Sequence, residues 1–321
     1  MTRGGGRGGR RVPAGPSTSM GNIERRDRVT ASAPRRVAAL MYHSVADDST
    51  PAMRELTVSP ERFDEQVGAL RAAGAQFVRA SEVLGLLRGE PIDDAAPIVA
   101  ITIDDAFADV LDAAAILARH DATATVFVPT AYVGMRAAWL EGEDARRPIA
   151  GWSDLAGLRD AGIELAAHGH WHIAADLNPP AVVQEDARRC RALLEDRLGV
   201  PVTTYAYPFG FHDRAGRRAI AAVGFDSAFA IFHLHARTGD DPFALPRLHV
   251  GPGISGARLA EMVRVRRPRI VEQGLRGKDR LFGAGRHVRR LGPPTSQRIA
   301  PYALDDYGRL RFGGGPDDGR P

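Results

Sequence analysis

One segment of the chain constrains both its fold and its chemistry. Val99–Ile103 is an apolar, largely β-branched run, which predicts a buried strand, and it ends directly in Asp104 and Asp105. Two adjacent carboxylates at a strand end repel each other and lose hydration unless something neutralises them. A divalent metal ion would neutralise both charges, so this segment predicts a strand that delivers carboxylates to a metal site.

A second strand-like run supplies matching metal ligands. The apolar run 163–167 is followed by His168, His170 and His172 at alternate positions, with Gly169 predicting a loop that runs into a short helix. One aspartate with two histidines is a mixed oxygen and nitrogen donor set suited to Zn²⁺ or a neighbouring transition metal. On the residues alone, the aspartates could instead cap the next helix, and a lone histidine could be an ordinary core or surface residue.

Strands and helices alternate along most of the chain. Strands are predicted at residues 37–41, 98–103, 123–128, 163–167, 203–207 and 225–230. Helices are predicted from Pro60 to just before Gly74, and at 108–119, 153–161, 182–198, 214–223 and 257–265. This alternation implies a mainly parallel sheet. Polar residues gather where the strands end, which favours a closed α/β barrel with its chemistry on one rim over an open sheet.

The charge is unevenly distributed and separates the chain into three parts. Residues 1–36 carry nine Arg against two acidic residues, and residues 258–321 carry fifteen basic against seven acidic residues. The predicted organisation is a disordered basic arm at 1–35, one barrel at 36–256, and a basic helix with an irregular tail at 257–321. The basic ends could bind an anionic surface, or could be solvated and flexible; no specific nucleic-acid partner is expected.

Several classes of protein are excluded by what the sequence lacks. Cys190 is the only cysteine, so neither an intramolecular disulfide nor a cysteine metal site is expected. No apolar run approaches the length of a transmembrane helix, which is about 18 residues or more. The N-terminus lacks the apolar core of a secretory signal, so the expected location is cytoplasmic.

Six segments, in order over about residues 37–255, resemble the polysaccharide deacetylase (NodB-homology) domain of carbohydrate esterase family four. The family's Thr-Phe-Asp-Asp motif appears as Thr102–Asp105, and its His-Ser/Thr-x-x-His motif is matched by His168–His172. The other four segments are Leu40–His43, Ala124–Val128, Ala206–Gly210 and Leu245–Arg247. The resemblance implies a distorted (β/α) barrel.

The resemblance also implies roles for individual residues. Asp105, His168 and His172 would bind a divalent metal, with Zn²⁺ expected first, and Asp104 would be the general base that takes a proton from the attacking water. The backbone N–H of Phe209 would help to bind the tetrahedral oxyanion. On sequence alone, the segment around Phe209 could equally be a Pro-Gly turn lined by aromatic residues.

The chain departs from the family pattern at two positions. Many members place an arginine, which orients the base, where this chain has Ala206. A subgroup with Tyr-His near the start and Leu-Pro-Arg near the end shares this change, so we expect Arg247 to hydrogen-bond Asp104 from another strand end. The alternative is a structural salt bridge to a surface acid. The family's Leu-x-His, which supplies a general acid, is matched only approximately by Arg247–His249, which makes His249 a candidate acid.

The leading hypothesis is an enzyme that removes an N-acetyl group from an amino-sugar glycan or sugar precursor. The family resemblance supplies this substrate, an acetylated carbohydrate, whereas the residues themselves indicate only metal-assisted acyl hydrolysis. The alternatives are hydrolysis of an O-acetyl ester or a formyl amide on a glycan, and a catalytically weakened glycan-binding barrel. A base beside a metal site argues against a binding module, while Ala206 is its best support.

Overall fold

Seven parallel strands close into a barrel in the computed structural model, which describes residues 34–265, Met1, Gly5 and the pairs 303–304 and 310–311. In spatial order the strands are β1 (Arg36–Tyr42), β5 (Ile98–Ile103), β6 (Thr125–Val128), β7 (Glu164–Ala167), β8 (Thr204–Ala206), β9 (Ser227–Ile231) and β11 (Leu245–His249). Each strand pairs in parallel with the next, and β11 pairs back with β1. The predicted α/β barrel is therefore confirmed.

Shorter strands extend this barrel or lie apart from it. The strand β4 (Gln76–Val78) pairs with β5, and β10 (Ala236–Arg237) pairs antiparallel with β1. Two small sheets are formed by β2 (Ser44–Val45) with β3 (Thr57–Val58), and by β12 (Ala303–Leu304) with β13 (Leu310–Arg311).

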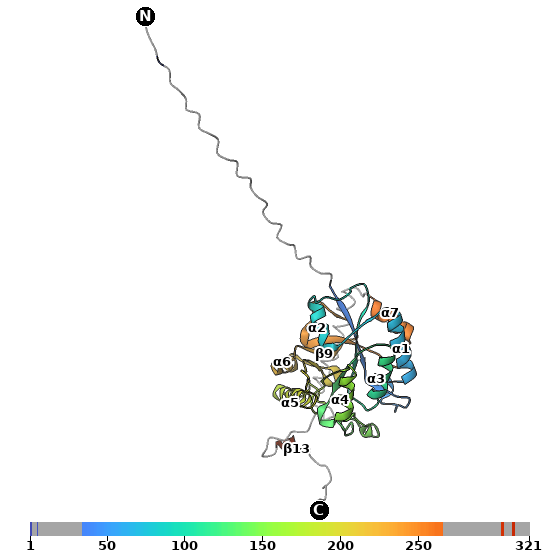
Figure 1. Ribbon diagram of the computed structural model, residues 1–321. Helices are drawn as coiled ribbons and strands as arrows, with labels where there is room; N and C mark the ends of the chain where they lie inside the picture. Colours follow the sequence, from blue (N-terminus) through green and yellow to red (C-terminus); the bar gives the residue numbers. More distant parts are fainter. Residues whose placement is uncertain (2–4, 6–33, 266–302, 305–309, 312–321) are drawn as a thin grey trace, which may run out of the picture. The chain divides into compact units, whose positions relative to one another are not determined.

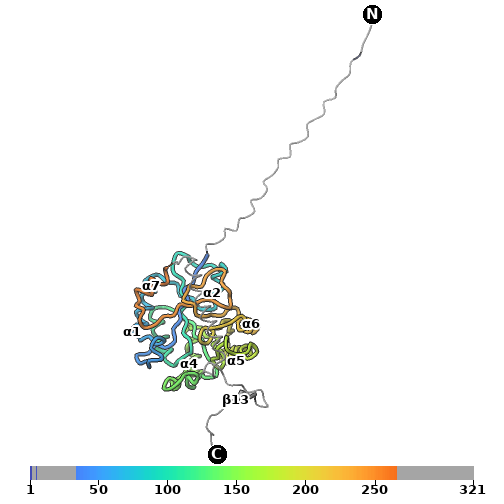
Figure 2. The backbone as a smooth tube through the Cα atoms, turned by 180° about the vertical axis from the view of Figure 1, so that it is seen from behind, coloured from blue at the N-terminus to red at the C-terminus, as the bar shows by residue number. Residues whose placement is uncertain are grey.

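Helices cover the outside of the barrel. They are α1 (Pro60–Ala72), α2 (Ala80–Arg88), α3 (Val110–Arg119), α4 (Trp152–Asp160), α5 (Pro180–Leu198), α6 (Arg214–Val223) and α7 (Gly256–Arg264). Figures 1 and 2 both place α7 beside α1, where Leu259 and Val263 are buried. Within the residues that the structure describes, no helix combines the length and the apolar character needed to cross a membrane.

Several elements were not predicted from the sequence, namely strands β2, β3, β4, β10, β11, β12 and β13 and helix α2. One further element was predicted wrongly. No range was predicted for strand β11, because Pro246 and Arg247 interrupt its apolar pattern, although Arg247 itself was expected at a strand end. The short helix α2 was not anticipated. The short helix expected after Gly169 is wrong: residues 168–179 form a loop, and α5 begins only at Pro180. The backbone N–H groups at positions 170 and 171 bond a carboxylate instead of helix carbonyls.

Strand alternation decides which side chains enter the barrel. The interior is filled by small and large residues from different strands, namely Ala39, Ala100, Ala166, Ala206, Phe127 and Phe229. Successive side chains of a strand point to opposite faces, so residues two positions further along share the inward direction. This rule brings Asp104, His168 and Arg247 to the inside of the carboxyl-terminal rim, and that rim carries the polar strand ends.

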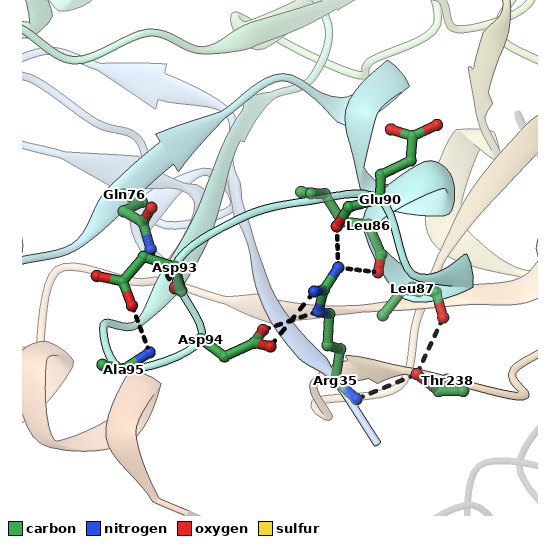
Figure 3. Close-up of polar contacts among 9 residues, drawn as sticks. All are labelled: Arg35, Gln76, Leu86, Leu87, Glu90, Asp93, Asp94, Ala95 and Thr238. Carbon is green, nitrogen blue, oxygen red and sulfur yellow. Dashed lines mark hydrogen bonds and ion pairs between the residues drawn. The ribbon is translucent and has the colours of Figure 1, made fainter. Parts of the chain in front are cut away.

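Arg35 fastens the opposite, amino-terminal end of the barrel (Figure 3). Its guanidinium bonds Asp94, with 2.7 Å between Nε and Oδ1, and donates to the carbonyl oxygens of Leu86 and Glu90 at the end of α2. Thr238 accepts from the Arg35 backbone N–H and donates to the Leu87 carbonyl. The start of β1, the end of α2 and the residue after β10 are thereby fixed to one another.

The predicted division at residues 35 and 256 stays a prediction. Both basic ends, apart from short pieces, lie outside the described residues. Their predicted binding to an anionic surface therefore stays a prediction as well.

Candidate metal centre and base

Three buried side chains converge on the carboxyl-terminal rim. The Nε2 atoms of His168 and His172 lie 3.4 Å and 3.0 Å from Oδ1 of Asp105. One donor atom from each residue lies within 4.8 Å of the others, so the group could hold a metal ion. The structure therefore brings together the three residues that the sequence analysis selected as ligands.

An unusual backbone conformation directs Asp105 into this group. Asp104 follows β5 with the inward parity, so regular alternation would turn the next side chain away from the barrel. Asp105 instead has φ of 73°, in the left-handed region, and Ala106 follows with φ of 51°. Such conformations cost about 1–3 kcal/mol each and are found at functional sites. The turn places two neighbouring carboxylates on one rim in different surroundings.

The hydrogen bonding of these residues fits a metal ion. Nδ1 of His168 lies 2.9 Å from the carbonyl oxygen of Ala206, which can only accept, so Nδ1 carries a proton and Nε2 is the nitrogen that could bind a metal ion. Burial lowers the pKa of His168, but the charges of Asp104 and Asp105 more than offset this and raise it, so a metal ion would displace a proton from Nε2. Asp105 Oδ1 is buried and accepts no hydrogen bond from any described residue, although two imidazoles approach it. A carboxylate oxygen and an imidazole nitrogen are the donors that Zn²⁺ takes.

Asp105 is held in its ionised form. Burial alone would raise its pKa, but the neighbouring His172 and His168 bring the pKa of the carboxyl well below its usual range. A deprotonated carboxylate is the form that binds a metal ion.

Asp104 has a different partner from Asp105. The guanidinium of Arg247 donates to both of its oxygens, over 2.6 Å to Oδ1 and 2.8 Å to Oδ2. This is the contact predicted from the sequence, in the two-pronged geometry that arginine alone provides. Arg247 is fully buried, also bonds Thr102, and lies 5.5 Å from the centre of the Phe127 ring.

Arg247 keeps the Asp104 carboxylate charged inside the protein. Burial raises the pKa of Asp104, and the cation of Arg247, with His168, more than offsets this, so that the pKa lies below its usual range. A base must be ionised to accept a proton, and Asp104 meets that condition.

Two further histidines lie on the same rim. His249 follows Arg247 by two positions on β11 and therefore shares its inward direction. Burial lowers the pKa of His249 to about 4, and the nearby His43 and His233 add to this shift. Burial also lowers the pKa of His43, although the charges of Asp104 and Asp105 oppose the shift.

Aromatic side chains surround His172. The Phe209 ring lies 4.7 Å from the imidazole of His172, and Trp139 lies at the same distance. The ring contact shows that the segment predicted to cover the site reaches His172, and Phe209 has a positive φ of 60°. Trp139 was not predicted, because it belongs to a loop without a regular apolar pattern.

Two other residues near the ligands turn out not to be ligands themselves. His170 lies between the two ligand histidines, but its Nδ1 lies 2.8 Å from the hydroxyl of Thr130. Asp186, on α5, accepts the hydrogen bonds of the loop and was missed from the sequence. A signal was present, since Asp186 stands in a helical stripe of otherwise apolar residues that includes Val183 and Cys190.

Comparisons with known proteins agree with this architecture. Residues 92–228 match the family model described as polysaccharide deacetylase. A relative described as the putative polysaccharide deacetylase YxkH of Bacillus subtilis is 22% identical over 225 residues, which cover 70% of this chain and 75% of the relative.

Solved structures share the fold. The Streptococcus pyogenes deacetylase PplD in complex with acetate superimposes with a TM-score of 0.64 at 22% identity, over 73% of this chain and 100% of that one. IcaB from Ammonifex degensii gives a TM-score of 0.60 at 24% identity, over 72% of this chain and 97% of that one.

The two neighbouring histidines, His168 and His170, allow a matched test of the metal ligands. We expect His168→Ala to lose tightly bound metal, because two remaining ligands hold a divalent ion weakly. His170→Ala should retain it, because that ring faces Thr130. Elemental analysis of both purified variants after dialysis would check this, and near-stoichiometric metal in His168→Ala would show that the ligand assignment is wrong.

Proposed function

Because the chain carries a domain of the polysaccharide deacetylase family, we propose that it is a metal-dependent hydrolase that removes N-acetyl groups from an amino-sugar glycan or sugar precursor. The family match and the shared fold support the class of enzyme. The acetyl group, the amino sugar and the dependence on metal are proposed from the residues on the rim.

One observation carries the proposal: two adjacent carboxylates have separate partners. Asp105 faces two imidazoles, whereas Asp104 is bonded through both oxygens to Arg247. Acyl hydrolysis needs one group that holds a metal ion and another that accepts a proton from water. A structural ion pair would explain Arg247 with Asp104 alone, but it would not explain the two histidines beside them.

Asp105, His168 and His172 would hold the ion, and we propose Zn²⁺ because the donors are one oxygen and two nitrogens. When bound, such an ion polarises an acyl oxygen and lowers the pKa of water. Nε2 of His168 is the nitrogen that could bind it, because Ala206 accepts the proton on Nδ1.

Asp104 is the proposed base. Its carboxylate accepts a proton from the water that attacks the acetyl carbon, and Arg247 fixes the direction of its oxygens. The Phe209 N–H is the proposed donor to the developing oxyanion. When the C–N bond breaks, the leaving nitrogen gains the proton that Asp104 took from water, and acetate is released. His249 is the candidate acid on this rim, and because its lowered pKa leaves it neutral near pH 7, it would relay this proton to the nitrogen.

The alternative of a weakened glycan-binding barrel rested on the missing arginine at Ala206. Arg247 now supplies a donor to the base from another strand, so the departure from the family pattern no longer argues against catalysis. An O-acetyl ester or a formyl amide would use the same groups and is separated by substrate tests.

The direct test is release of acetate from N-acetylglucosamine oligomers. The purified protein should release acetate with Zn²⁺ present, stop after treatment with a chelator, and recover when the metal is restored. An O-acetylated glycan and an N-formyl amino sugar serve as comparison substrates. No hydrolysis of any of the three by metal-loaded protein would contradict the proposed function.

Replacing each aspartate separates the two proposed roles. Asp104→Asn should keep its metal and lose about 10²–10⁴-fold in kcat, which is the usual contribution of a general base. Asp105→Asn should lose metal first, and activity with it. The roles would have to be exchanged if metal were lost from the first variant and kept in the second.

The orienting role of Arg247 has a matched control on α5. Arg247→Lys should lower kcat by about 10- to 100-fold with metal content unchanged, because an ammonium cannot bond both oxygens of Asp104. Arg191 also pairs with a carboxylate, that of Glu195, and lies 5.5 Å from the centre of the Phe225 ring. Neither of these partners belongs to the proposed site. Arg191→Lys should leave kcat unchanged, and equal losses in both variants would refute a specific role.

A further inference from the structure

A buried carboxylate on α5 lies behind the loop that joins the two ligand histidines. Asp186 accepts hydrogen bonds from the backbone N–H groups of Trp171, over 2.7 Å to Oδ1, and His170, over 3.0 Å to Oδ2. Asp186 is completely buried. Asp186 therefore bonds two consecutive N–H groups at the middle of the loop that carries His168 and His172, whose carbonyls at positions 169 to 171 accept from residues 130 to 132.

The loop also fits closely against this carboxylate. A Cβ atom added to Gly169 would come within 2.5 Å of Asp186 Oδ2, and Gly169 has φ of 77°. A glycine is required there for both reasons. The residues between the two ligand histidines, Gly169 to Trp171, thus all approach Asp186.

Stability does not explain why this position holds an aspartate. Its hydrogen-bond partners are two uncharged backbone N–H groups, and the charges of His168 and Arg189 do not offset the cost of burying its carboxylate. Burial raises the pKa of Asp186 to about 7, even though both hydrogen bonds favour the charged form. An apolar residue would continue the buried stripe of α5 at lower cost.

We propose that Asp186 is a positioning residue, which sets the metal affinity of the site by fixing the backbone between His168 and His172. This inference rests on the metal site of the proposed function. Groups that orient ligands in this indirect way typically change metal affinity by about 10- to 100-fold.

The first experiment compares two buried aspartates, with Zn²⁺ affinity measured on metal-free protein by competition with a chromophoric chelator. Asp186→Asn should raise the Kd about 10- to 100-fold, because the amide nitrogen would face a backbone N–H and one bond is lost. Asp144 is also buried and bonds Thr50 and Arg147, away from the ligand loop. Asp144→Asn should keep the wild-type Kd even if its melting temperature falls.

A second pair of variants approaches the same contact from the loop. Gly169→Ala should weaken Zn²⁺ binding to a similar degree, because its Cβ displaces Asp186. Gly162 has a comparable φ of 84° but open space around a Cβ, so Gly162→Ala carries the backbone strain without the collision and should bind Zn²⁺ normally. This pair gives the answer if Asp186→Asn does not fold.

The outcomes are distinct. Weaker binding in Asp186→Asn or Gly169→Ala, with both controls unchanged, supports the inference. Wild-type affinity in these two variants, or equal weakening in the controls, overturns it while leaving the proposed function intact. Failure of the wild-type protein to bind a divalent metal would instead overturn the metal site itself, and this inference with it.

Discussion

The buried pair between Arg247 and Asp104 is the interaction on which the rest of the site depends. Both groups are desolvated, and removing one partner from such a pair typically costs about 3–5 kcal/mol because the other charge is left uncompensated. The two hydrogen bonds, of 2.6 Å and 2.8 Å, keep Asp104 ionised within the barrel. Without that cation, two neighbouring carboxylates could not share this rim so far from water.

The backbone at Asp105 makes the second half of the site possible. A regular strand would have sent the two carboxylates to opposite faces, one into the barrel and one toward the helices. The left-handed turn brings both to the rim but gives them different neighbours, imidazoles for Asp105 and a guanidinium for Asp104. The strained backbone at Asp105 thus allows two adjacent aspartates to take different roles.

Much of the barrel and of the candidate site could be predicted from the sequence, because strand alternation and the polar strand ends are local patterns. Those patterns located six of the barrel strands and a cluster of aspartate and histidine residues. The choice of Asp105 as the ligand and the contact of Arg247 with Asp104 came from the resemblance to the deacetylase family. Strand β11 could not be recognised, because its Arg247 is buried by a partner 143 residues away. Trp139 and the loop after His168 were also beyond local patterns, since tertiary contacts such as that of Asp186 determine their conformation.

The position of the orienting arginine on β11, and not at Ala206 on β8, has a consequence for how the sequences of such barrels can diverge. At Ala206, where the pattern of the family that the sequence resembles has the orienting arginine in many members, the backbone carbonyl bonds His168, while the guanidinium comes from β11. A closed ring has no first or last strand, and every strand end faces the same centre. A long side chain can therefore reach the same target from a different strand, provided that the residue on the original strand is small enough to leave room inside the barrel. A search for the orienting arginine at one fixed position of a sequence alignment would overlook such a relocation. A comparison of which strands place large and small side chains inside the barrel would detect it.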